Sequence, residues 1–302
     1  MSLLIAEQFL NGIQLGVMLF LMAAGLTLVF GVMGLINLAH GSLYMVGAFA
    51  AAFVAANTGS YLLGIVASVV AAAVAGVLIE TLVIRRLYKR DHLDQVLATF
   101  ALILIFSEGT RMIFGSFPLY LSIPDALGGP ITLPGGIEYP LFRLTLIAMG
   151  LLVAVGLYLL ITKTRVGMQI QAGEADREMI SALGVDISKL YTFVFALGAA
   201  LAGLSGALVG TLQSVEVGMG EPVLIMAFVV IVIGGIGSIQ GALVGAVLVG
   251  VVQTLGAFLL PIWSKMLFGS PDAGAVLSSM LIYILMAGVL LIRPQGLMGQ
   301  AA

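Results

Sequence analysis

The sequence predicts an all-α membrane protein, a polytopic bundle of about nine transmembrane segments that includes short or broken helices. The first reason is composition, since 61% of the residues are hydrophobic and only 9% are charged, whereas about a quarter of a soluble domain is charged. The mean hydropathy of +1.21 agrees with this. The second reason is a series of apolar runs of roughly the 20 residues that a membrane helix needs. We therefore expect a multi-pass protein of the cell inner membrane, surrounded by lipid, with a single transmembrane domain over residues 1–302.

The predicted spans end where glycine, proline or charged residues interrupt the apolar runs. They cover residues 8–30, 42–57, 60–84, 94–113, 140–161, 190–213, 223–236, 241–260 and 275–292. Cytoplasmic loops are enriched in Lys and Arg, and basic residues gather at 85–90, at 163–189 and at Arg293. With an odd number of spans, this places the N-terminus outside and the C-terminus in the cytoplasm. Segments of loop-like composition are then expected outside, at 115–140, 214–221 and 261–274.

Several classes of function are excluded by what the chain lacks. The net charge of −2 provides no clustered basic surface for nucleic acid. Without any cysteine, disulfides and thiolate metal sites are impossible, and His40 and His92 alone make a poor zinc site. No Gly-Lys pair occurs, so the chain has no Walker A loop to bind ATP. We expect no catalytic residue and no metal ligand, because a membrane-embedded enzyme would need a convergent set of reactive groups.

Asn37 and His40 stand in a long apolar stretch, since no Asp, Glu, Lys or Arg occurs between Glu7 and Glu80. Gly34 and Gly41 flank the pair. This pattern is typical of a helix broken at membrane depth, which is tolerated only where the backbone faces protein or a watery cavity. Two interpretations stay open: the polar side chains cap the broken helix ends or bond a neighbouring helix, or they contact a solute that passes through the membrane. Nothing in the sequence supports coupling to protons through His40.

A faint internal repeat adds a second candidate break. The segment 34–41 aligns with 234–241, matching at the first glycine, at Ile36 and Ile236, and at the last glycine. Repeated broken helices often mark the binding region of a transporter. We therefore expect a solute path lined by Asn37, His40, Ser42, Gly34, Gly41, Gly234, Gly235, Gly237 and Gln240.

The cytoplasmic loop 162–189 contains a short amphipathic pattern at 172–184. Helical spacing places one set of side chains on an apolar side, namely Ala175, Met179 and Leu183. The opposite side is polar and mainly acidic, with Glu174, Arg177, Glu178 and Ser181. We expect one short helix that stops at Gly184. A helix lying on the membrane surface is the alternative, but such helices favour Lys and Arg on the polar face.

Four motifs in order along nearly the whole chain resemble one family. They are Asn37-Leu-Ala-His-Gly41, Gly234-Gly-Ile-Gly-Ser238, the stretch from Thr164-Arg-Val-Gly167 to Ala182-Leu-Gly-Val185, and Arg293-Pro-Gln-Gly-Leu297. Together they are similar to the permease subunits of high-affinity branched-chain amino-acid ABC importers. The resemblance implies a complex with a sister permease subunit, two cytoplasmic ATPases and an extracytoplasmic solute-binding protein. It also implies that ATP is used by the partner ATPases and that this chain binds no cofactor.

The resemblance assigns roles to both candidate regions. It implies that the loop segment is a coupling helix that docks on an ATPase, through Glu174, Asp176, Arg177, Glu178, Met179, Leu183 and Gly184. Many family members have an acidic residue after the His-Gly pair, where this chain has Ser42, so no carboxylate is available there for a substrate ammonium. The expected solutes are branched-chain or related small amino acids, with urea, short amides and aromatic or small carboxylates as alternatives. An ion-driven secondary transporter would be expected to have more acidic groups within its spans.

Overall fold

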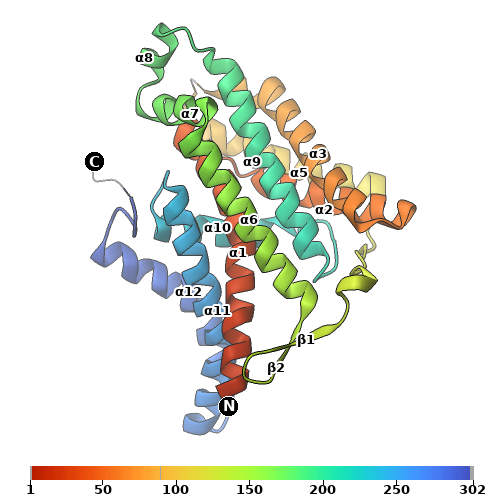
Figure 1. Ribbon diagram of the computed structural model, residues 1–302. Helices are drawn as coiled ribbons and strands as arrows, with labels where there is room; N and C mark the ends of the chain where they lie inside the picture. The colour runs from red at the N-terminus through yellow and green to blue at the C-terminus, as the bar shows by residue number, and fades with distance from the viewer. Residues whose placement is uncertain (1, 89, 300–302) are drawn as a thin grey trace. The chain divides into compact units, whose positions relative to one another are not determined.

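The computed structural model describes residues 2–88 and 90–299, and these are almost entirely helical (Figure 1). A single two-stranded antiparallel hairpin is formed by β1 (Pro130–Leu133) and β2 (Ile137–Pro140). The long helices are α1 (Ser2–Met33), α2 (His40–Thr58), α3 (Tyr61–Ile79), α5 (His92–Phe114), α6 (Leu141–Lys163), α9 (Ile187–Gly210), α10 (Gly220–Gly234), α11 (Ile239–Phe268) and α12 (Asp272–Ile292). Shorter elements are the π-helix η1 (Glu80–Ile84), α4 (Arg85–Leu87), the 3-10 helix η2 (Asp125–Leu127), α7 (Arg165–Ala175) and α8 (Arg177–Ala182).

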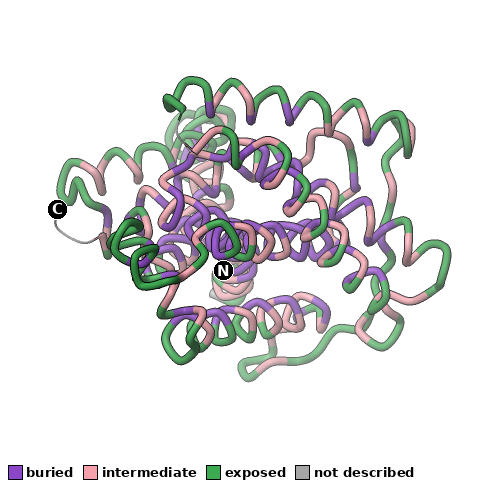
Figure 2. The backbone as a smooth tube through the Cα atoms, turned by 90° about the horizontal axis from the view of Figure 1, so that it is seen from above, coloured by how far each residue is buried: buried purple, intermediate pink, exposed green. Residues whose placement is uncertain are grey.

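The predicted polytopic helical bundle is confirmed. Within the described ranges, eight helices are long and apolar enough to cross a membrane, and α10 is a shorter apolar helix. Burial differs sharply among them, because 83% of the most apolar stretch of α1 is buried but only 11% of that of α12. Figure 2 shows this contrast along the backbone. The exposed apolar side chains of the outer helices suit contact with lipid or with another membrane subunit.

The chain forms two compact units, each made of several chain segments. The α9 unit comprises residues 24–123 and 153–225, and the α11 unit comprises residues 2–23, 124–152 and 226–299. Both units are therefore built from parts of the chain that are far apart in sequence.

Small residues determine the packing of the α9 unit, in which α2, α3 and α9 lie against one another (Figure 1). A Cβ on Gly47 of α2 would meet the backbone of Gly203 on α9, and a Cβ on Gly203 would meet Ala72 and Ser68 of α3. The hydroxyl of Ser68 on α3 donates to the Gly203 carbonyl at 2.6 Å. Close backbone approach through Gly, Ala and Ser is how membrane helices gain contact where lipid supplies no hydrophobic driving force.

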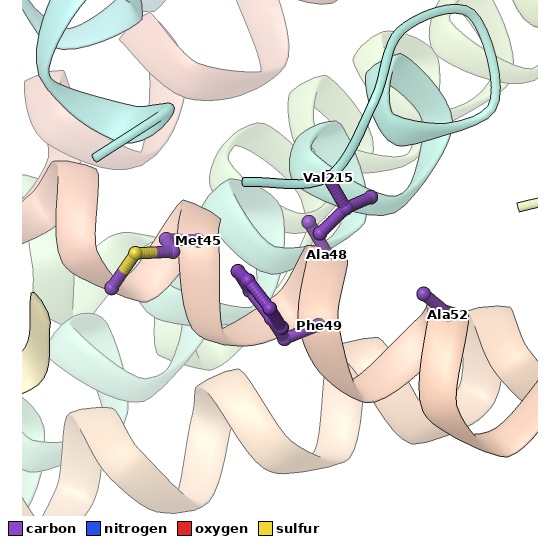
Figure 3. Packing of buried hydrophobic residues seen from close by; sticks show 5 residues of the cluster. All are labelled: Met45, Ala48, Phe49, Ala52 and Val215. Carbon is purple, nitrogen blue, oxygen red and sulfur yellow. The ribbon is translucent and has the colours of Figure 1, made fainter. Parts of the chain in front are cut away.

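An apolar cluster secures one end of the same unit (Figure 3). Met45, Ala48, Phe49 and Ala52 of α2 pack with Val215, which follows α9. Val215 also exchanges two backbone hydrogen bonds with Leu119, of 2.8 and 2.9 Å. The connection between α9 and α10 is thereby attached to α2 by side-chain packing and to the segment after α5 by backbone hydrogen bonds.

The α11 unit contains the paired helices α11 and α12 and the β-hairpin. Gly256 of α11 lies against Leu281 of α12. The hairpin is attached to α1, because the Tyr139 hydroxyl of β2 donates to Asn11 Oδ1 at 3.0 Å. The Arg143 guanidinium of α6 donates to the same oxygen. Asn11 thus joins α1 to β2 and α6, which lie far from it in sequence.

Two of the predicted loops were wrong in part. Residues 115–140 contain the β-hairpin, whose turn uses Gly135 and Gly136 at φ of 97° and 79°. Helix α11 continues through Pro261 to Phe268 and ends where Gly269 adopts a φ of +77°. Proline removes one backbone donor, but neighbouring groups in a membrane bundle can satisfy the freed carbonyl. The left-handed glycine was therefore the better marker of the helix end than the proline.

Gly206→Ala is expected to destabilise the protein by about 1–3 kcal/mol, as overpacking of a close contact does. The reason is that a Cβ at Gly206 of α9 would collide with the Tyr44 carbonyl of α2. Gly288→Ala on α12 is the matched control, because its Cβ would meet no atom within 4 Å. Thermal unfolding in detergent should show a lower midpoint for the first variant only; equal effects would contradict the packing argument.

Candidate functional site: the helix break and the cytoplasmic loop

Helix α1 ends at Gly34, and the chain then runs without helical structure to His40. Gly34 has a φ of +65°, and its N–H donates to the Phe30 carbonyl at 2.7 Å, which is a glycine-terminated helix end. Burial alternates along the following residues: Leu35, Asn37 and Ala39 are buried, and the residues between them are partly exposed. The segment is not helical at residues 34–37 and ends in a turn at residues 38–39. The break expected from the sequence is therefore a non-helical segment with alternate residues buried.

Asn37 is fully buried at the start of α2. Its Oδ1 accepts a hydrogen bond from the Ala39 N–H at 3.0 Å, a local turn that asparagine side chains commonly form. Its Nδ2 has no hydrogen-bond partner within the described part of the chain. The oxygen thus forms a local turn just before α2, whose N-cap residue Ala39 has no side-chain cap, and the nitrogen is a buried donor.

His40 is also fully buried and begins α2. Its ring lies beside Gly25 of α1, where an added Cβ would be 3.0 Å from His40 Nε2 and 2.6 Å from the Gly198 carbonyl oxygen of α9. The ring therefore lies where α1 and α9 cross. The space for it exists because Gly25 and Gly198 have no side chains there. One residue further, a Cβ at Gly41 would lie 2.8 Å from the carbonyl oxygen of Gly220, the first residue of α10. The first turn of α2 is thus enclosed by three helices of its own unit.

The second candidate break is a tight turn between α10 and α11. Gly235 and Gly237 adopt φ of +105° and +85°, and the Ser238 hydroxyl accepts from the Gly241 N–H at 3.0 Å to cap α11. Gly241 then packs directly on Gly234. Gln240 is exposed. The turn between α10 and α11 is thus a compact helical hairpin. It differs from the longer non-helical segment after Gly34, although segments 34–41 and 234–241 align.

The C-terminal motif completes this second turn. The N–H groups of Leu297 and Met298 donate to the carbonyls of Ile233 and Gly234 at 2.8 and 2.9 Å. These carbonyls end α10 and would otherwise lack partners within the helix. The residues after Arg293 therefore serve as a cap supplied from a distant part of the sequence.

The predicted path residues fall into two groups. Gly34, Asn37, His40, Gly41 and Ser42 come together in the α9 unit. The others belong to the α11 unit, namely Gly234, Gly235, Gly237 and Gln240.

The loop 162–189 contains two helices where the sequence predicted one across 172–184. That prediction was wrong at Asp176, whose φ of −156° separates α7 from α8. The Asp176 carboxylate accepts hydrogen bonds from the N–H groups of Glu178 and Met179 at 2.9 and 3.0 Å. Aspartate competes in this way for backbone donors and favours a helix start. The predicted stop is present, since Gly184 has a φ of +88° and Val185 N–H returns to the Ile180 carbonyl.

Helix α8 presents apolar side chains on its surface. Met179 is 61% exposed and Leu183 77% exposed, whereas Ile180 is buried and holds the helix against its unit. Glu174 is exposed overall, yet desolvation around its carboxyl raises the pKa above the usual value. Asp186 caps α9, and the N–H of Lys189 lowers the pKa of its carboxyl.

A buried carboxylate near this loop, Glu80, was missed by sequence reasoning. Glu80 is 0% exposed and accepts from Arg85 through Nε at 3.1 Å and Nη2 at 2.9 Å. The hydroxyls of Tyr88 and Thr192 add bonds of 2.7 and 2.8 Å, and burial raises the pKa of Tyr88. The π-helix η1 brings residues five apart onto one face. A spacing of five between Glu80 and Arg85 was the available sequence signal.

Comparison with known proteins covers nearly the whole chain. A family model described as branched-chain amino acid transport system, permease component, matches residues 8–290. The chain is 30% identical to the high-affinity branched-chain amino acid transport system permease protein BraD of Pseudomonas aeruginosa, over 97% of this chain and 95% of that protein. It is 28% identical to LivH of Escherichia coli, a permease protein of the same description, with the same coverage.

A probable branched-chain amino acid transport permease protein LivH of Methanocaldococcus jannaschii is 31% identical over 93% of this chain and 89% of its own. No solved structure matches the chain. These likenesses and the eight apolar helices show a multi-pass membrane protein with a role in transport. The chain belongs to the family of branched-chain amino acid transport system permease components.

Proposed function

We propose that this chain is the permease subunit of an ABC importer that moves branched-chain or related small amino acids across the cell inner membrane. The observation that supports this best is the family match over residues 8–290, a match that spans the candidate path and the cytoplasmic loop together. We propose the orientation that the basic loops favour, with the N-terminus outside and the C-terminus in the cytoplasm.

The chain works with other subunits under this proposal. A sister permease subunit completes the path, two cytoplasmic ATPases hydrolyse ATP, and an extracytoplasmic protein delivers the solute. The absence of a Gly-Lys pair supports the division of labour, because this chain has no phosphate-binding loop of its own. The chain itself is then a translocation subunit without enzymatic activity or a bound cofactor.

Translocation follows from a change at the broken helix. The non-helical segment from Gly34 to Ala39 lacks the ladder of hydrogen bonds that makes a helix rigid, so it is where α1 and α2 can change their relation. A solute shifts such an equilibrium only by binding the two states differently. A small, weak solute surface at Asn37 and His40 therefore suffices, and specificity resides mainly in the binding protein.

Docking on the ATPase uses α8. Its exposed Met179 and Leu183 form an apolar surface bordered by Glu174 and Glu178. A surface of this kind suits a groove with apolar walls and basic edges better than an anionic membrane surface.

Reconstitution tests the function directly. Proteoliposomes that contain this chain, its sister permease, both ATPases and the binding protein should take up radiolabelled leucine only when ATP is present inside. Omitting the binding protein is the control and should abolish uptake. If a loaded binding protein stimulates the ATPase but leucine is not transported, the solute assignment is wrong and urea, short amides and aromatic acids are tested next. No stimulation by any of these solutes would contradict the importer proposal.

Replacing the apolar surface of α8 should separate docking from folding. The double variant Met179→Ser, Leu183→Ser is expected to lose co-purification with the ATPases, while the thermal midpoint of the isolated chain changes little because both side chains are exposed. The matched control is Met266→Ser, Leu267→Ser near the end of α11, where exposure is 79% and 76%. ATPase retention by the α8 variant would show that α8 is not the docking element.

Two substitutions of Asn37 distinguish capping from solute contact. Asn37→Ser keeps an oxygen that can accept from the Ala39 N–H but removes Nδ2, and Asn37→Ala removes both groups. We expect capping to dominate, so the serine variant should retain more than about half of leucine uptake and the alanine variant should lose about 1 kcal/mol of stability, as for a lost cap. Equal loss of uptake in both variants, with normal assembly, would instead assign Nδ2 to the solute.

A further inference from the structure

The guanidinium of Arg177 lies against the helix break. Arg177 is the first residue of α8, and a Cβ placed on Gly34 would be 3.1 Å from Arg177 Nη2. Both residues belong to the α9 unit. The cytoplasmic helix with the exposed Met179 and Leu183 is therefore in direct contact with the point where α1 ends.

The chemistry of this contact is favourable. The last carbonyl groups of α1 have few N–H donors within the helix, and together they form its negative end. A cation near these carbonyls is electrostatically favourable. In the described part of the chain, no carboxylate forms an ion pair with Arg177, so its charge acts on the helix end.

Gly34 has the properties of a hinge. Its φ of +65° is accessible to glycine at little cost, and hinges are single positions at the ends of elements that absorb large changes of dihedral angle. The absence of a side chain also leaves the space that the guanidinium occupies. The non-helical segment that follows contains Asn37 and ends where α2 begins at His40.

Helix α8 can move as one body. Asp176 caps its first turn, Gly184 ends it, and the buried Ile180 is an apolar contact with the rest of the unit beside that of Arg177. A partner bound to the exposed Met179 and Leu183 would displace the whole helix, and with it Arg177.

We infer that Arg177 is a positioning residue that transmits displacement of α8 to the Gly34 hinge, and so sets the conformation of the segment that contains Asn37 and His40. The inference rests on the proposed function, because it assumes that a partner ATPase moves α8. It adds the physical link between the docking surface and the solute path.

The test measures coupling in the complete reconstituted complex, as leucine transported per ATP hydrolysed. Arg177→Ala is expected to lower this ratio by about tenfold, within the range measured for residues that couple distant sites, while the ATPases still co-purify and hydrolyse ATP. Arg177→Lys keeps the charge and should restore more than half of the ratio. The control is Arg165→Ala, an exposed arginine at the start of α7, which should leave the ratio within about twofold of the unmodified complex.

A double-mutant cycle tests the link to the hinge. Gly34→Ala strains the backbone and places a methyl group against the guanidinium. This variant alone should therefore lower the leucine-to-ATP ratio. The double variant Gly34→Ala, Arg177→Ala should have a ratio no lower than that of the more damaging single variant. If the reductions in the two single variants multiply in the double variant, the inference is overturned. An unchanged ratio in Arg177→Ala, or loss of the ATPases from that variant, would also overturn it. Failure of the proposed function would be distinct, since the unmodified complex would then transport no amino acid.

Discussion

Backbone hydrogen bonding inside a membrane is the constraint on which the rest of this structure depends. Lipid offers no partner to a free N–H or C=O group, so each interruption of a helix must be enclosed by protein. The segment after Gly34 satisfies this by burying alternate residues and by using the Asn37 oxygen as a local acceptor. The end of α10 satisfies it through two hydrogen bonds from the C-terminal residues. The polar and glycine-rich motifs of the chain stand where these interruptions occur.

The same constraint produces two breaks with different mechanical character. The turn between α10 and α11 is short, capped at both ends and packed glycine on glycine, which leaves it little freedom. The non-helical segment between α1 and α2 has few backbone hydrogen bonds and begins at a left-handed glycine. The α2, α3 and α9 helices of the same unit are packed closely through small residues.

Charged groups gather where the long helices of that unit meet the loop 162–189. Glu80 is completely buried but has four donor contacts, from Arg85, Tyr88 and Thr192. This arrangement ties the π-helix to α9 and offsets the cost of removing a carboxylate from water. Arg177 extends from α8 to the end of α1 in the same unit. An electrostatic contact thus adds to the apolar packing of Ile180 in linking α8 to its unit.

Hydrophobicity and glycine placement are local properties, and the sequence by itself therefore determined the membrane class, the spans and the positions of both breaks. It also predicted the stop at Gly184, because a left-handed helix end depends on the residue itself. It did not show that Asp176 divides the loop helix, that α11 passes through Pro261, or that Glu80 is a buried anchor. It also could not place Arg177 on Gly34 or the C-terminal residues on α10. Those contacts join residues far apart in the chain, and only the tertiary packing of the helices decides which of them meet.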